Sequence, residues 1–359
     1  MRVAHALPML LEGHGFCFRD PNDCASVMTT TDTFDIHRHM PSHLDISGFM
    51  LIDKKAERPC ASLVPGTLFG TSDNNDVVSH IIGPVCRAAV SQQNPVAFMC
   101  ALVASGAVLP GNEQEVTRVD SLLSSPVSSR TASYLCSITR NCTQLIQAFS
   151  NVNGAAVVII GCGGIGSLAA LILAGAGIAR VRLIDHDTIE ASNLNRQLFW
   201  TRNDIGRRKV DVLAEAIHHR FPDVEVEMVR TDYQASVATY SMSGIHIVLA
   251  SADRPVGLIR SVLAEAQRFR IPVIHAGYFQ HFAAVRVYTD EKQVRCNEVS
   301  WKVLPNAVMP SFGPTNAELA GLASSIAMQL IARLLDSQYL NMTWSTRFPR
   351  SFIGAGDGN

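Results

Sequence analysis

Apolar residues in the C-terminal part of the chain follow two alternating patterns. Short apolar runs, rich in β-branched residues, predict buried strands near residues 157–160, 181–184, 224–229, 245–250 and 273–275. Between them, Val210, Leu213, Ala214 and Ile217 recur at helical spacing, and an alanine-rich stretch predicts a helix over residues 316–336. Strands that alternate with helices predict an α/β fold with a doubly wound, Rossmann-like sheet.

The N-terminal part has a different pattern. Short β-rich pieces at residues 3–11, 25–36 and 49–54 alternate with turn clusters, and an apolar stretch predicts a helix over 97–108. Residues 112–127 are polar and serine-rich, which is typical of a linker, and residues 130–149 read as a helical connector. We therefore expect a smaller α+β domain over 1–120, a linker and helical connector over 121–150, and the larger α/β domain over 151–359.

Composition narrows the class of protein. The 359 residues include 30 basic and 31 acidic side chains without a Lys/Arg block, which argues against a nucleic-acid or membrane-surface partner. A charge-free stretch at 155–179 is long enough to span a bilayer, but its glycines favour a buried strand, turn and helix. We expect no membrane anchor and no signal peptide. Nine scattered cysteines are typical of reduced thiols in the cytoplasm.

A glycine-rich motif follows the first of these strands. Gly161-x-Gly163-Gly164-x-Gly166 stands between strand and helix, where glycines permit a tight turn, close approach of phosphate and close packing of helix on strand. Asp185 comes 19 residues after Gly166, at the end of the next strand. A carboxylate at this position typically accepts hydrogen bonds from the ribose hydroxyls of a bound nucleotide. This motif serves NAD and ATP equally well.

Charged residues further along distinguish the two nucleotides. Hydride transfer does not need Arg196 and Lys209 near the phosphates, whereas displacement at phosphorus needs cations to neutralise developing charge. Asp253 follows the strand at 245–250 and suits Mg²⁺, which prefers carboxylate and phosphate oxygens. Simpler structural roles stay open: Asp187 closing a turn, Arg196 as a solvated cation, and Asp253 capping a helix.

Taken in order, these motifs resemble those of the ThiF/MoeB-like adenylating enzymes, relatives of the ubiquitin-activating enzymes, over about residues 128–336. The matching elements are the glycine loop, the acid-x-acid pair Asp185/Asp187, Ser192-Asn-Leu-Asn-Arg-Gln197, Gly206-Arg-Arg-Lys209 and the later Asp253. The resemblance implies that ATP is bound, with Asp185 at the ribose, and that Asp253 holds Mg²⁺. It assigns the triphosphate and transition state to Asn193, Arg196 and Lys209.

The resemblance also implies a homodimer. Arg130 stands at the spacing where the family places an arginine that enters the partner subunit's active site, although the second arginine of the family's pair is replaced by Ser133. A cation donated in this way would act on the transferring group as an arginine finger does.

The clearest departure from the family concerns zinc. Many members hold a structural zinc with two C-x-x-C pairs, whereas this chain has only Cys296 at the first pair and no cysteine in its tail. One ligand cannot close a tetrahedral site, so no zinc is expected. Cys296 is then either a thioester-forming residue or a small buried hydrophobe.

The length in front of the glycine loop favours the peptide-modifying branch of the family, to which the enzymes of microcin C and pantocin A biosynthesis belong. Ala276-Gly-Tyr278 and Phe312-x-Pro314-x-Asn316 resemble segments of that branch. In it, the N-terminal domain acts as a clamp for a ribosomally made precursor peptide.

The resemblance therefore implies ATP-dependent adenylation of a carboxylate, in particular a glutamate side chain of the precursor, on the way to a modified or cyclised antibiotic such as pantocin A. Adenylation of the C-terminus of a sulfur-carrier or ubiquitin-like protein is an alternative. An NAD-dependent oxidoreductase is another, supported by the glycine motif alone.

Overall fold

A computed structural model describes residues 36–72, 77–91, 94–234, 241–252, 254, 257–294, 311–335, 340–347 and 352–353. The chain divides into two compact units, Met1–Phe149 and Ser150–Asn359. The expected strands at residues 3–11 and 25–36 lie outside the described residues, apart from Ile36.

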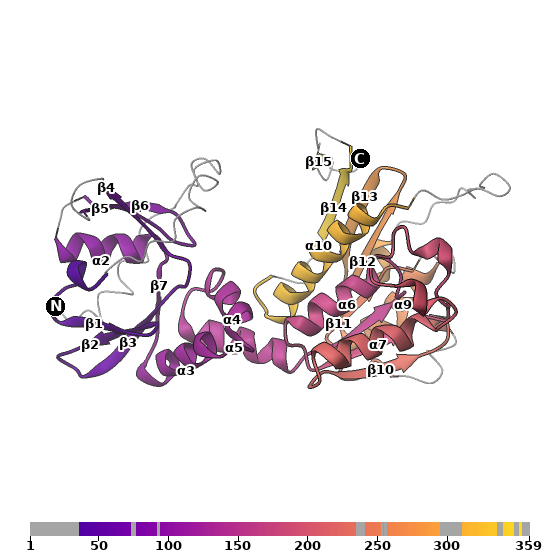
Figure 1. The fold of residues 1–359 in the computed structure, drawn as a ribbon, viewed down its shortest axis with the longest axis horizontal. Helices are drawn as coiled ribbons and strands as arrows, with labels where there is room; N and C mark the ends of the chain where they lie inside the picture. Colours follow the sequence, from indigo (N-terminus) through magenta and orange to yellow (C-terminus); the bar gives the residue numbers. More distant parts are fainter. Residues whose placement is uncertain are drawn as a thin grey trace. The chain divides into compact units, whose positions relative to one another are not determined.

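The C-terminal unit is built on an eight-stranded sheet in the order β10-β9-β8-β11-β12-β13-β14-β15 (Figure 1). The first five of these strands are parallel, and the last three continue the sheet in antiparallel fashion. The strands are β8 (Ala156–Ile160), β9 (Arg180–Ile184), β10 (Glu225–Val229), β11 (Ile247–Ala250), β12 (Val273–Phe279), β13 (Phe282–Tyr288), β14 (Leu340–Ser345) and β15 (Phe352–Ile353).

Helices cover both faces of this sheet. α6 contacts both α7 and α10, while α9 packs against the other face through a core that includes Val158, Val248, Val262 and Val273. All five residues of β8 are buried, as expected of a central parallel strand. The helices are α6 (Gly166–Gly175), α7 (Lys209–Arg220), α9 (Leu258–Ala266) and α10 (Gly313–Ile331). The predicted doubly wound α/β fold is thus confirmed.

The chain direction in the sheet determines where a ligand can bind. From β8 the chain moves outward to β9 and β10, and then returns to the opposite side of β8 to form β11 and β12. This reversal leaves a crevice at the carboxyl end of β8, between two chain crossings that run in opposite directions. The glycine loop lies at that point.

The N-terminal unit holds two antiparallel sheets, in the orders β1-β2-β3-β7 and β4-β5-β6. Its core joins Leu51, Ala61, Ile81, Phe98 and other apolar residues from both sheets and α2. The strands are β1 (Leu44–Ser47), β2 (Met50–Asp53), β3 (Arg58–Leu63), β4 (Leu68–Ser72), β5 (Val77–Ile82), β6 (Arg87–Ala89) and β7 (Val108–Pro110). The helices of this part are α2 (Pro95–Ala104), α3 (Glu113–Ser124), α4 (Ser129–Cys136) and α5 (Cys142–Asn153).

Two predictions for the N-terminal part were wrong. The expected linker at 112–127 contains the helix α3, which begins with a capping box in which Asn112 and Glu115 bond each other's backbone N–H. Its buried face carries Val116 and Val119 at helical spacing. The helix expected over 97–108 ends at Ala104, because Gly106 takes a left-handed conformation (φ +74°) and turns the chain into β7.

The long C-terminal helix begins earlier than expected, at Gly313, because Pro314 fits the first turn of a helix and needs no hydrogen-bond acceptor there. It ends at Ile331, before Arg333 takes a left-handed conformation (φ +58°). In the described part of the chain, no helix is long and apolar enough to cross a membrane. The charge-free stretch at 155–179 forms β8, the glycine loop, α6 and the start of the turn to β9.

Candidate nucleotide-binding site

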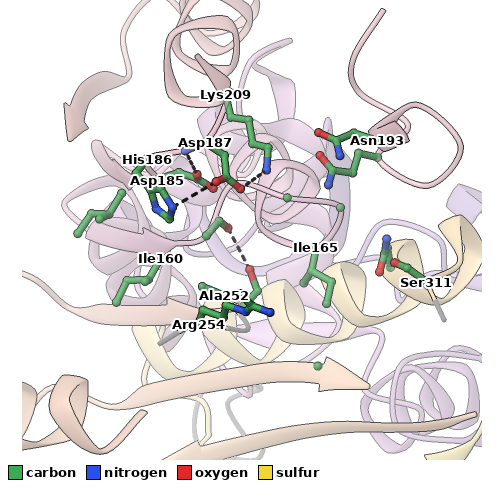
Figure 2. Close-up of a pocket in the computed structure, with 18 of the residues that line it drawn as sticks. Ile160, Ile165, Asp185, His186, Asp187, Asn193, Lys209, Ala252, Arg254 and Ser311 are labelled. Atoms are coloured by element: carbon green, nitrogen blue, oxygen red, sulfur yellow. Dashed lines mark hydrogen bonds and ion pairs between the residues drawn. The ribbon is translucent and has the colours of Figure 1, made fainter. Parts of the chain in front are cut away.

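A cavity of about 870 Å³ opens at the carboxyl ends of the parallel strands (Figure 2). Its lining includes the glycine loop after β8, the acidic residues after β9, and Ser251 and Ala252 after β11. The chain of β12 and the residues before α10 contribute Tyr278 and Ser311. The volume is within the range of small-molecule sites. Residues that the sequence places far apart therefore meet in one cavity of nucleotide size.

The glycines of the loop are required by backbone contacts. Gly161 has φ +86°, and a Cβ there would stand 2.8 Å from the backbone nitrogen of Ala252. A Cβ on Gly166 would overlap the carbonyl oxygen of Gly161 and approach Ser251 Oγ to 2.9 Å. Ser251 Oγ donates to that same carbonyl oxygen over 3.0 Å. The loop is thus held tightly between β8 and β11, which leaves the N-terminal amides of α6 beside the cavity.

Asp185 is fixed by two backbone donors. Its two carboxylate oxygens accept hydrogen bonds from the N–H of Cys162 (2.6 Å) and the N–H of Asp187 (2.7 Å). The residue is 8% exposed and lines the cavity. Each oxygen has a further lone pair, so the anchored carboxylate can still accept hydrogen bonds from hydroxyl groups of a ligand. The structure therefore holds the Asp185 carboxylate in a fixed position at the cavity, where it can accept hydrogen bonds from a ligand.

Lys209 supplies a buried cation. Its side chain is 7% exposed, and its Nζ donates to Asp187 Oδ2 over 2.7 Å. Lys209 begins α7, and its backbone N–H donates to the carbonyl of Asp187 over 3.1 Å, which ties the two residues together twice. Figure 2 shows the pair beside His186. The ammonium group has further N–H donors with which it can bind an anionic ligand.

Asn193 and Arg196 lie on a turn that forms another wall of the cavity. Asn193 is buried in a short 3₁₀ helix, and its side-chain oxygen accepts from the N–H of Glu190 over 3.1 Å. Arg196 is partly exposed, and its Nη1 donates to the carbonyl of Ser192 over 2.6 Å and to Asn195 Oδ1 over 3.0 Å. Both residues line the cavity. The guanidinium bonds only neutral acceptors of its own turn in these contacts, so its charge is available to a ligand.

One amide side chain connects this turn to the glycine loop. Asn316 is 4% exposed, and its Nδ2 donates to the carbonyl of Arg196 over 3.0 Å. A Cβ on Gly164 would overlap this amide group, so Gly164 is needed for close approach of α10. Asn316 was expected only as part of the segment Phe312-x-Pro314-x-Asn316, without a role of its own. Tyr278, Ser311 and Arg254 also line the cavity without having been predicted.

Asp253 and Cys296 lie outside the described residues. Arg130 lies on α4 in the N-terminal unit, and its side chain is exposed. The other predicted residues line the cavity: Gly161, Gly163, Gly164, Asp185, Asp187, Asn193, Arg196 and Lys209. Gly166 packs instead against the carbonyl of Gly161.

The described residues offer one group of candidate metal ligands, formed by Asp185, His186 and Asp187. Its donor atoms are already engaged by protein groups: Asp185 by two backbone N–H groups, and Asp187 by Lys209 and by His186 at 3.3 Å. This trio therefore does not fit a divalent cation well in the present arrangement. Cys162 is no candidate nucleophile either, because burial raises the pKa of its thiol well above the ordinary value.

A doubly wound sheet with a glycine loop, an anchored carboxylate and a buried lysine at one cavity is typical of nucleotide-binding α/β proteins. The model of the ThiF family matches residues 146–352, more than half of the chain, and the chain belongs to that family. The predicted resemblance to ThiF/MoeB-like adenylating enzymes is confirmed at this level.

Curated relatives match the chain in part. Ubiquitin-like modifier-activating enzyme 5 of Drosophila ananassae is 33% identical over 116 residues, which cover 32% of this chain and 28% of the relative. The molybdopterin-synthase adenylyltransferase of Salmonella typhimurium is 26% identical over 182 residues, which cover 50% of this chain and 73% of that enzyme. The chain spans less than half the length of the first curated relatives it matches.

Among solved structures, the chain is similar to the microcin C7 biosynthetic enzyme MccB in complex with N-formylated MccA. The TM-score is 0.61 at 20% identity, and the match covers 81% of this chain and 96% of that chain. The structure of Escherichia coli MccB with ATP gives a TM-score of 0.62 at 21% identity, and the match covers 82% of this chain and 96% of that chain. This likeness spans most of the chain, so the fold is shared well beyond the region that the family model matches.

Proposed function

We propose that this protein is an ATP-dependent adenylating enzyme that activates a carboxylate of a ribosomally made precursor peptide. The observation that carries the proposal is the cavity in which the anchored Asp185 and the buried Lys209 flank a glycine loop. Membership of the ThiF family supports ATP as the nucleotide, and MccB, which shares the fold, has been solved with ATP. An acid alone would serve NAD as well as ATP, whereas a buried lysine at the phosphate side favours ATP.

The proposed chemistry is attack of a carboxylate oxygen on the α-phosphorus of ATP, with departure of pyrophosphate and formation of an acyl adenylate. Asp185 would hold the ribose, and the glycine loop and the N-terminus of α6 would bind phosphate oxygens. Arg196 and Lys209 would stabilise the negative charge that spreads over the triphosphate in the transition state. No general base is needed, since a carboxylate is already ionised at neutral pH.

Two further parts of the proposal come from the family resemblance. Asp253 would hold Mg²⁺, which prefers carboxylate and phosphate oxygens and would neutralise charge on the triphosphate. Arg130 would reach the site of a second copy of the chain in a homodimer. The protein would work without a structural zinc, since Cys296 is the one cysteine left at the family's zinc positions.

The peptide substrate is supported by the fold. MccB, a microcin C7 biosynthetic enzyme with the same fold, has been solved in complex with the precursor peptide MccA. We propose that the N-terminal unit of this chain recognises the peptide, through a sheet edge or a groove. A glutamate side chain is the proposed point of activation, leading to a modified or cyclised product of the pantocin A type.

A second candidate is adenylation of the C-terminus of a sulfur-carrier or ubiquitin-like protein. The match to a molybdopterin-synthase adenylyltransferase favours this candidate, since the alignment with that relative covers half of this chain. Both candidates predict the same use of ATP and differ in the molecule that carries the carboxylate. Hydride transfer with NAD would need neither Arg196 nor Lys209 at the phosphates.

Exchange of labelled pyrophosphate into ATP tests the proposal. Short peptides encoded beside the gene, synthesised with and without amidation of their glutamates, would be compared with purified sulfur-carrier proteins. We expect exchange that depends on a peptide and disappears when the activated carboxylate is amidated. Exchange with carrier proteins alone would favour the second candidate, and tight binding of NADH without any exchange would remove both.

A further inference from the structure

One side chain, that of Asn316, connects two parts of the cavity wall: the glycine loop and the turn that carries Arg196. The glycine loop belongs to the turn between β8 and α6, Arg196 belongs to the turn after β9, and Asn316 belongs to the first turn of α10. Asn316 donates to the Arg196 carbonyl over 3.0 Å and packs against Gly164. Its contacts therefore fix the distance between the glycine loop and the turn that carries the guanidinium.

We propose that Asn316 is a positioning residue that holds the Arg196 turn against the glycine loop, so that the guanidinium meets the β- and γ-phosphates of MgATP. This inference rests on the proposed use of ATP by the same site. Asn316 makes its hydrogen bond to the Arg196 turn, whereas the carboxylate of Asp185 accepts from the N–H groups of Cys162 and Asp187. Loss of the amide should therefore weaken binding of the triphosphate and spare binding of the nucleoside part.

The donor group is the essential feature of this side chain. Arg196 offers a carbonyl oxygen, which can only accept, so residue 316 must donate. An aspartate has the same shape but no donor at neutral pH, and its charge would face the carbonyl dipole. Because the first turn of a helix favours a carboxylate, Asn316→Asp should still allow α10 to form. The aspartate variant thus separates donation from packing.

The start of α10 is itself held from β12. The hydroxyl oxygen of Tyr278 accepts a hydrogen bond from the N–H of Phe312 at 2.9 Å. The same hydroxyl forms a hydrogen bond with Ser311 Oγ at 2.5 Å, in which either oxygen can be the donor. Phe312 is the residue that precedes the helix, and Asn316 follows one turn later. The amide of Asn316 is therefore placed by β12, whose Tyr278 lines the same cavity, and not by the Arg196 turn alone.

Calorimetric titration of the full chain with MgATP and with AMP tests the inference. In Asn316→Asp and Asn316→Ala we expect the affinity for MgATP to fall about tenfold, which is the cost of one lost hydrogen bond, while AMP binding changes less than about twofold. Arg196→Ala should show the same selectivity. Adding Asn316→Asp to Arg196→Ala should lower MgATP affinity no further, because the guanidinium that the amide positions is already absent.

Ser324→Ala provides the matched control, since Ser324 is a buried polar residue of the same helix whose hydroxyl bonds none of the described residues. It should bind both nucleotides as the wild type does. The inference is overturned if the Asn316 variants bind MgATP normally, lose AMP as strongly as MgATP, or add fully to Arg196→Ala. A wild-type chain that binds AMP but not MgATP would instead remove the proposed function, and this inference with it.

Discussion

Asp185→Asn is the substitution that best tests the ribose side of the site. The carboxylate accepts backbone N–H groups on both oxygens, from Cys162 at 2.6 Å and from Asp187 at 2.7 Å. An asparagine keeps one acceptor and turns the other into an NH₂ group, which would face a backbone N–H at a buried position. The variant therefore loses a charge-assisted hydrogen bond and leaves a buried donor unpaired.

Such a loss costs about 2–3 kcal/mol of unfolding free energy, which lowers the Tm of a unit of roughly 200 residues by about 5–10 °C. Since Asp185 would bind the ribose, the affinities for AMP and MgATP should fall together, each by about tenfold or more. This joint loss differs from the selective loss of MgATP expected for Asn316 variants. Thermal unfolding followed by scanning calorimetry and nucleotide titration measure the two effects.

Asp211→Asn serves as the control, because Asp211 pairs with Arg230 at 2.8 Å on the surface of α7, away from the cavity lining. A surface pair of this kind contributes about 1 kcal/mol or less, so Tm and nucleotide affinity should hardly change. The reasoning about Asp185 would be refuted if Asp185→Asn melted like the wild type and bound AMP with unchanged affinity.

Three further predictions concern other parts of the molecule. Lys209→Met should lower peptide-dependent pyrophosphate exchange by about 10²-fold or more, and normal exchange would exclude this lysine from the transition state. Burial and the nearby Arg286 lower the pKa of His275 to about 4, below its ordinary value of 6.5. As pH falls through 6.5, the histidine therefore takes up its proton in the unfolded chain but not yet in the folded one. Between pH 7 and pH 5 the wild type should lose about 2 kcal/mol of unfolding free energy from this histidine, and His275→Gln should not. Denaturant titrations at both pH values measure the difference. Asn112→Ala removes the cap of α3 and should cost about 1 kcal/mol in the same titration without changing nucleotide affinity; an unchanged stability would contradict the capping role.

Local patterns predicted the parts of the fold whose signals are short in sequence. The apolar run before Gly161 and the spacing of Val210, Leu213, Ala214 and Ile217 each led to the correct element, since burial on a sheet or on one helix face imposes that periodicity. The missed helix α3 also had a local signal, the Asn112-x-x-Glu115 capping box followed by apolar residues at helical spacing. Its serine content led to the wrong interpretation, because serine is common in linkers and also tolerated on exposed helix faces.

Other features depend on contacts between distant segments and have no local signature. The antiparallel strands β13 and β14 extend the parallel sheet, and their pairing joins segments about 60 residues apart. Likewise, Gly164 is a glycine because Asn316, about 150 residues later, packs against it, and nothing in the glycine motif itself reveals that partner. The residues of the site could be named from sequence, but the contacts that hold them could not.

The glycine motif alone left ATP and NAD equally possible, and the structure gives a physical reason to separate them. Lys209 is almost fully buried and its ammonium bonds one carboxylate oxygen of Asp187, a half-exposed residue. A lysine ammonium has three N–H donors, and the carboxylate of Asp187 accepts from one of them, which leaves donors for a second anionic group. A bound triphosphate would supply this anionic group, whereas a dinucleotide pyrophosphate carries less charge and has no group under attack. A buried lysine at this position therefore fits the proposed binding and cleavage of ATP, whereas hydride transfer does not require it.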